Sequence, residues 1–303
     1  MISVTATFFL SFSVLALSQK GNNSFFLSFA FICLFIAILY STLTSESYIN
    51  SFDYANEAER RANTDLNSNQ YAYFSLFTIM AVRLMLGRIS IYKPLLGLFI
   101  YFVLAGLSFF VALLTASRQV LLLEIPLIVY FVFFDFSTKD NKINRVFLFL
   151  FILVAAFFFL PKITSLYDSS YLAVRSGEDI EEDARSYLLL MGLHQGLDNP
   201  MFGLGFGANV LFSHCTYTHL LARCGVPAFI TYIYMVYISI KEQYQRYKTT
   251  HDKYFRLYLF MLVFFAVANF FYSYINQPFM QTIMFLIIGE SDKLYSKYRK
   301  MFL

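Results

Sequence analysis

The chain has 303 residues, of which 58% are hydrophobic, 20% are aromatic and only 14% are charged, and its net charge at pH 7 is +4. Soluble domains carry about 25% charged residues, so this composition excludes a soluble enzyme and a disordered chain. The small, scattered positive charge argues against a nucleic-acid partner, and three cysteines are too few for a disulfide framework. A protein that crosses a membrane several times remains.

Long apolar stretches recur along the chain, and about 20 apolar residues are enough for a helix to cross the hydrocarbon core of a bilayer. Helices are expected because backbone polar groups find no water there. We predict an all-α, polytopic transmembrane helical bundle that forms a single membrane domain over 1–303. The nine predicted spans are roughly 2–18, 24–42, 71–87, 94–116, 119–136, 146–161, 226–240, 257–272 and 276–289. The last two could instead form a helical hairpin that does not fully cross.

The distribution of basic residues predicts how the bundle is oriented. With the N-terminus outside, 15 of the 23 Lys and Arg residues fall in cytoplasmic segments and 7 fall in outside segments. This bias follows the positive-inside rule. Both long polar segments, 43–70 and 162–225, then face away from the cytoplasm, and the C-terminus lies in the cytoplasm.

The segment 162–225 is the one sizeable part of the chain that we predict to lie outside the membrane. An acidic run followed by apolar residues at helical spacing predicts a short helix over about 181–196, which the sequence Asp198-Asn199-Pro200 ends. A second helix is predicted to end at Gly225, just before the span 226–240.

Two glycines lie between these two predicted helices. Gly203 and Gly205 alternate with larger residues, and glycines in such an arrangement let a backbone turn sharply or approach a ligand closely. They do not form a dinucleotide-binding fingerprint, because no strand precedes them. A flexible turn and a substrate contact both remain open at this point.

Two histidines and two cysteines near the end of the segment raise the question of a metal site. His214 and His219 are five residues apart, about 140° around a helix, so they do not share a face. Cys215 and Cys224 are nine residues apart, roughly 13 Å along a helix, which is too far for a disulfide. The spacing argues against a metal ion, and we expect none.

Arginines on the predicted outer side are candidates for binding an anion. Arg118 lies in a very short turn between two spans, where the positive-inside bias disfavours a cation. It is either an anchor to lipid phosphate or an anion ligand, because a guanidinium presents a planar fork to phosphate oxygens. Arg60 and Arg61 lie in the other outside segment, where simple solvation is an alternative.

Four sequence features, considered together, carry a family resemblance. They are Asp65-Leu66-Asn67-Ser68-Asn69 before a span, Ser117-Arg118 at the start of a span, Arg185 and Leu189 followed by Asn199-Pro200 and Gly203-x-Gly205, and His214-Cys215 with nine residues before Gly225. Over roughly residues 60–235 the chain resembles the O-antigen ligase and O-antigen polymerase superfamily of bacterial membrane glycosyltransferases. It departs from the family at Cys215, where Asn, Ser or Gln is usual, and at Arg223, where an acidic residue is common.

The resemblance implies a glycosyltransferase C-like bundle in the bacterial inner membrane, with a large periplasmic helical loop at 162–225. The implied donor is an undecaprenyl-diphosphate-linked oligosaccharide, the acceptor is a hydroxyl of a glycan or of the lipid A core, and neither a cofactor nor a metal is required. The implied catalytic residues are His214, which would accept the hydroxyl proton, and Arg185 and Arg118, which would hold the diphosphate. The implied substrate-binding residues are Arg60, Arg61, Arg223, Gly203 and Gly205.

Polymerase and ligase share this donor and differ in the acceptor. The short chain and the divergent motif residues favour a polymerase, with a chain-length regulator as a further partner. A transporter or flippase is the alternative from another class, because Arg83 and Glu124 are charges within predicted spans. No inverted repeat supports that alternative. An inactive, truncated member of the superfamily is the third possibility.

Overall fold

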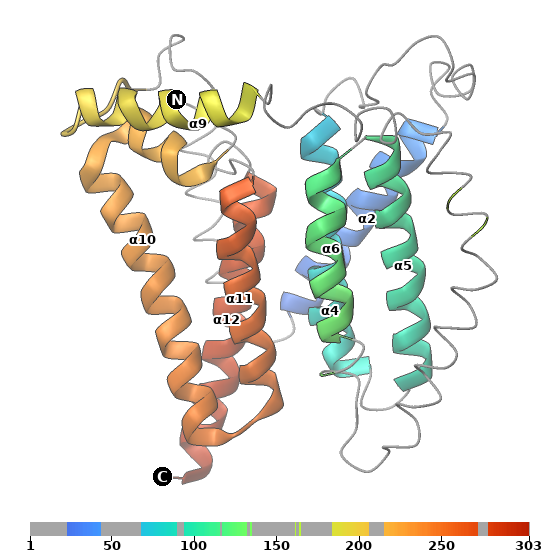
Figure 1. Cartoon of the computed structure of the whole chain (residues 1–303). Helices are drawn as coiled ribbons and strands as arrows, with labels where there is room; N and C mark the ends of the chain where they lie inside the picture. Colours follow the sequence, from blue (N-terminus) through green and yellow to red (C-terminus); the bar gives the residue numbers. More distant parts are fainter. Residues whose placement is uncertain are drawn as a thin grey trace. The chain divides into compact units, whose positions relative to one another are not determined.

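The computed structural model describes residues 23–43, 68–89, 94–115, 117–131, 184–205, 215–271 and 278–302, with the single residues 134, 161 and 164. Every regular element in these ranges is helical, as predicted (Figure 1). The chain divides into two compact units. We call Ser28–Glu178 the N-terminal unit, and Asp179–Leu303 together with Met1–Leu27 the C-terminal unit. Each unit is described by itself, so a single membrane domain over 1–303 stays a prediction.

The N-terminal unit is built around α4 (Ser68–Ile89), with α2 (Asn23–Leu43) and α5 (Pro94–Leu114) as neighbours. Every α4 residue from 71 to 83 is buried, so this helix is covered on all sides. The ring of Phe31 in α2 stacks on Phe74, with ring centroids 4.5 Å apart. α5 packs on α4 and buries one stripe at helical spacing, consisting of Tyr101, Leu104, Ala105, Ser108, Val111 and Ala112.

A tight turn leads from α5 into α6 (Arg118–Tyr130). In this turn the backbone N–H of Ser117 donates to the carbonyl of Ala112 at 3.0 Å. α6 buries a single stripe, consisting of Val120, Leu123, Glu124 and Leu127. Leu122, Ile125 and Val129 are exposed apolar side chains, which is the pattern of a helix with one face toward lipid.

Polar side chains of α4, α5 and α6 meet inside the N-terminal unit. The hydroxyl oxygens of Ser75 and Ser108 lie 3.0 Å apart, and the Glu124 carboxyl lies near Ser108. Arg83 and Glu124 are each only 2% exposed, so both of these charged residues within predicted spans are buried. A buried polar group is expensive unless it has a partner, and the contact between Ser75 and Ser108 supplies one for each hydroxyl.

The C-terminal unit contains α9 (Ala184–Asp198), α10 (Thr216–Thr250), α11 (Lys253–Phe271) and α12 (Pro278–Phe302). α9 lies crosswise at the beginning of α10, whereas α11 and α12 run alongside the rest of it (Figure 1). Gly225 has non-helical backbone angles and divides α10 into two segments, 216–224 and 226–250. The Tyr217 hydroxyl donates to the Ala266 carbonyl at 2.9 Å and ties the first segment to α11.

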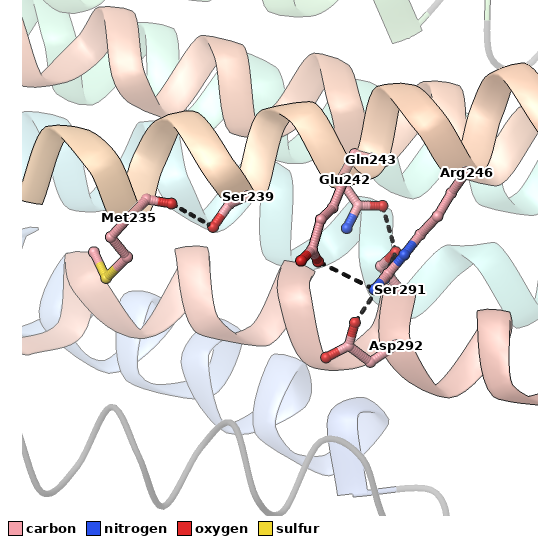
Figure 2. A network of polar contacts seen from close by, with 7 residues as sticks. All are labelled: Met235, Ser239, Glu242, Gln243, Arg246, Ser291 and Asp292. Atoms are coloured by element: carbon pink, nitrogen blue, oxygen red, sulfur yellow. Dashed lines mark hydrogen bonds and ion pairs between the residues drawn. The ribbon is translucent and has the colours of Figure 1, made fainter.

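A polar network joins α10 to α12 at the end of α10 that is remote from α9 (Figure 2). Arg246 forms ion pairs with Asp292 at 2.6 Å and with Glu242 at 3.3 Å, and it donates to the Ser291 hydroxyl at 2.9 Å. The Ser291 hydroxyl in turn donates to the side-chain oxygen of Gln243. The network fixes the register of the two helices, because its α10 residues lie in one turn and its α12 residues are adjacent in another.

Two described helices, α10 and α11, are long and apolar enough to cross a membrane, judged by length and composition. Shorter apolar stretches, Ser28–Ala37, Tyr71–Leu86 and Phe99–Ala112, coincide with predicted spans. The predicted span 2–18 lies outside the described residues, and of 146–161 only Pro161 is described. The chain therefore has the helices of a membrane protein, while the count of nine spans and their orientation stay predictions.

Two helices extend well beyond the predicted spans. α10 continues to Thr250, although the predicted span ends at 240, and α12 continues to Phe302 rather than 289. The added turns carry Lys, Arg and Glu residues that end an apolar stretch but not a helix, because these residues are good helix formers. Hydropathy therefore predicted the apolar part of each helix, and residues with high helix propensity extend the helix beyond that part.

Candidate functional site

The turn that follows α9 docks on the kink of α10. The backbone N–H of Leu204 donates to the carbonyl of Ala222 at 2.8 Å, and that of Gly205 donates to the carbonyl of Arg223 at 2.9 Å. The N–H of Val226 donates to the carbonyl of Pro200 at 2.7 Å. These three bonds join a turn and a helix that are separated by about twenty residues of chain.

The kink itself creates the groups that the turn satisfies. In an unbroken helix the Ala222 carbonyl would accept from Val226 and the Arg223 carbonyl from Pro227. Pro227 has no N–H, and the φ of 78° at Gly225 points Val226 elsewhere. The two carbonyls are thus left at a helix end without helical donors, and residues 204 and 205 provide replacements.

Three glycines permit this close approach. A Cβ on Gly196 would lie 2.4 Å from Leu221 Cγ, a Cβ on Gly203 would lie 2.5 Å from the carbonyl carbon of Arg223, and a Cβ on Gly225 would lie 2.7 Å from the Pro200 oxygen. Real Cβ atoms do not approach other atoms so closely, so a side chain at these positions requires the backbone to move. We call residues 196–205 and 221–226 the glycine clamp.

Gly203 and Gly205, both predicted to contact substrate, have different surroundings. Gly203 faces the backbone of Arg223, so packing within the chain explains its lack of a side chain. Gly205 also has a positive φ, 74°, but no atom lies within 4 Å of its Cβ position. The open side of Gly205 is therefore the place in the clamp where a ligand could approach the backbone, and the substrate contact remains a prediction at both positions.

Of the other predicted residues of the C-terminal unit, Arg223 belongs to the clamp, Arg185 lies in α9, and His214 is not described. Arg223 is half-buried and is next to last in the first segment of α10, where the helix dipole also favours a cation. Arg185 is the second residue of α9, about 16 Å along the helix axis from Gly196. His214 lies outside the described residues and immediately precedes the buried Cys215, which starts α10 with extended backbone angles.

Arg118 belongs to the N-terminal unit and is the first residue of α6. The Ser117 side chain, at the N-cap position, makes no capping hydrogen bond to the first turn. No carboxylate in the described ranges forms an ion pair with Arg118, which is half-buried. The guanidinium and the helix N-terminus both carry positive charge at this position. Arg60 and Arg61 lie outside the described residues.

Histidine and cysteine side chains do not gather into a metal-binding cluster in the part of the chain that the structure describes. His219 is fully buried, and the three cysteines are free thiols. The prediction that no metal takes part is not tested by these observations.

Sequence analysis missed Gly196. It lies four residues after Gly192, and both glycines are buried in α9. Small residues at this spacing let two helices approach closely. The spacing was visible in the sequence and could have predicted that α9 packs tightly on another helix.

A family model described as O-antigen ligase matches residues 102–233. No curated protein matches the chain, and no solved structure matches it. The matched range extends from α5 into the second segment of α10, so it includes Arg118, Arg185, Gly203, Gly205, His214 and Arg223. Arg60 and Arg61 precede it.

Proposed function

We propose that this protein transfers a glycan from an undecaprenyl-diphosphate-linked donor to a sugar hydroxyl. The premise is that residues 102–233 belong to the O-antigen ligase and O-antigen polymerase superfamily, since the family match confirms the resemblance. The observation that carries the proposal is the matched range, because it holds the predicted catalytic residues Arg118, Arg185 and His214. The reaction takes place at the periplasmic face of the inner membrane and requires no metal.

The proposed reaction is a single displacement. The acceptor hydroxyl oxygen attacks the anomeric carbon of the donor glycan and forms the new glycosidic bond. The bond between that carbon and the diphosphate oxygen breaks, and undecaprenyl diphosphate leaves with the electron pair. The hydroxyl proton passes to the His214 imidazole, whose ordinary pKa lies near neutral pH.

Charge on the leaving diphosphate must be stabilised without a metal, and Arg118 supports this role. A cation at this helix N-terminus combines a guanidinium fork with backbone N–H donors that the Ser117 side chain does not cap. Such fixed donors act strongly in a site from which water is excluded. We assign the first diphosphate contact to Arg118 and the second to Arg185, with Arg60 and Arg61 as further candidates.

The glycine clamp supports a substrate-binding role for Gly205 and Arg223. Gly205 leaves its Cβ side open, and Arg223 lies directly across the hydrogen bond that holds it. A sugar hydroxyl or a phosphate oxygen can approach backbone at Gly205 more closely than at a residue with a side chain. Gly203 contributes by holding the turn in place.

Reconstitution into liposomes tests the proposal. Lipid-linked oligosaccharide is supplied on one face with an acceptor glycan, and transfer is read from the product mass in the presence of a chelator. His214→Ala is expected to lower turnover by about 10²-fold or more, and Arg118→Ala by about 10²- to 10³-fold. Lys248→Ala, which alters an exposed lysine near the end of α10, is the control. Movement of the intact donor across the bilayer without a product would show a flippase instead.

The polymerase is the form of the reaction that we favour, and a deletion strain separates it from a ligase. Lipid A core carrying a single repeat unit on a lipopolysaccharide gel is the expected result for a polymerase. Bare core with retained lipid-linked glycan would assign the ligase reaction instead.

A further inference from the structure

α9 exposes large apolar side chains on one face. Four leucines, Leu189, Leu190, Leu193 and Leu197, fall within an arc of about 100° of the helix, and all are exposed. Phe202 in the turn that follows is 83% exposed. We call these five residues the α9 apolar face. No Asp, Glu, Lys or Arg occurs from 186 to 197, so no charged residue lies among the four leucines.

Helical surfaces elsewhere in the same unit show what this chain presents to water. The last turns of α10 expose Lys241, Glu242 and Lys248, and the last turns of α12 expose Lys297 and Lys300. Contiguous exposed leucines are instead typical of a surface that binds protein or membrane. The α9 apolar face therefore needs a non-aqueous partner.

The glycine clamp fixes the position of α9 along the axis of α10. Its hydrogen bonds hold the end of α9 beside the kink at Gly225, and the apolar segment of α10 begins directly after that kink. That segment exposes Ile230, Ile233 and Tyr234, which suit lipid contact. α9 lies crosswise to α10 (Figure 1), and the clamp holds it beside the point at which this apolar segment begins.

We propose that α9 is an interfacial helix and that the α9 apolar face is embedded among the lipid acyl chains of the leaflet in which the second segment of α10 begins. The side of α9 that carries Gly192 and Gly196 is buried against the protein and is not exposed to water. Helices of this kind lie in the plane of the interface with their apolar side in the boundary of the acyl chains. The inference holds whether or not the protein transfers glycans.

The chain contains no tryptophan, so one introduced tryptophan reports its own surroundings. Leu193→Trp and Phe202→Trp each place the probe on the α9 apolar face. Ile233→Trp on α10 is the reference for contact with acyl chains, and Lys297→Trp on α12 is the reference for contact with water. Each full-length variant is reconstituted into phosphatidylcholine vesicles with plain or brominated acyl chains.

Both α9 probes are expected to show blue-shifted emission and quenching by brominated chains, as Ile233→Trp does. Quenching by aqueous acrylamide instead, as for Lys297→Trp, would overturn the proposal. Protection from both quenchers would also overturn it, because protein rather than lipid would then cover the face. Phe202 is so exposed that replacing it with tryptophan disturbs no packing, which keeps the test valid if Leu193→Trp fails to fold.

Discussion

The glycine clamp predicts that two substitutions with the same chemistry have different effects. Gly203 and Gly205 have φ values of 62° and 74°, so an alanine at either position is strained by about 1–2 kcal/mol. At Gly203 the new Cβ would also lie 2.6 Å from the Ala222 oxygen, whereas at Gly205 it meets nothing within 4 Å. Gly203→Ala must therefore push the turn away from α10.

The size of the difference follows from the bonds that such a retreat breaks. The turn loses the N–H donors of Leu204 and Gly205 to α10, and each hydrogen bond contributes about 1 kcal/mol net. Opening of the clamp should therefore be favoured by about 2 kcal/mol more in Gly203→Ala than in Gly205→Ala. That difference is roughly 30-fold in the opening equilibrium, since about 1.4 kcal/mol is tenfold.

Hydrogen exchange read by mass spectrometry measures this opening directly. Peptides that contain Leu204 and Val226 are followed in the purified wild-type protein and in both variants, under conditions in which exchange reports the opening equilibrium. Gly203→Ala should exchange these amides roughly 30-fold faster than Gly205→Ala. Equal exchange in the two variants would refute the claim that contact with the α10 backbone, rather than the turn conformation alone, requires glycine at 203.

Three further predictions concern other contacts. Gly196→Ala should raise the hydrogen exchange of the α9 amides, because its Cβ would meet Leu221. Gly106→Ala has open space around its Cβ, so it should leave the free energy of unfolding unchanged or raise it by up to about 1 kcal/mol. Similar protection of α9 amides in both variants would argue against close packing at Gly196. Arg246→Gln and Asp292→Asn should show a coupling of about 1 kcal/mol in a double-mutant cycle of unfolding, since both groups are partly exposed, and additive effects would contradict the pair. Arg118→Lys keeps the charge but loses the fork, so it should retain more transfer than Arg118→Ala and less than wild type, and wild-type activity would show that charge alone suffices.

Elements with local signals were well predicted from the sequence. The apolar run 24–42 corresponds to α2, and the acidic run before 181–196 together with Pro200 predicted α9 to within three residues at each end. The end of a helix at Gly225 was also predicted. These features depend on residues that are neighbours in the chain, such as helix formers, a proline and a glycine that tolerates positive φ.

Packing was not predictable in the same way. α4 contains two arginines and α5 contains no charged residue, yet α4 is buried on every side from 71 to 83 and α5 buries one stripe. Gly203 and Gly205 look equivalent in sequence, and only the backbone of Arg223 across from one of them separates a packing glycine from an open one. The role of a glycine depends on what approaches it, which is a property of the fold and not of the local sequence.

The clamp also links the proposed substrate contact to the direction of α10. Pro227 removes one helical donor, Gly225 turns the chain, and the freed carbonyl of Arg223 is then held by the N–H of Gly205. A ligand that draws the Gly205 N–H toward itself must take that donor from Arg223 and leave a helix-end carbonyl without a partner. Binding at Gly205 therefore costs least when the ligand uses the open side of the residue and leaves its backbone hydrogen bond intact. Contact through that open side is the one that permits a substrate to bind while α10 keeps its kink.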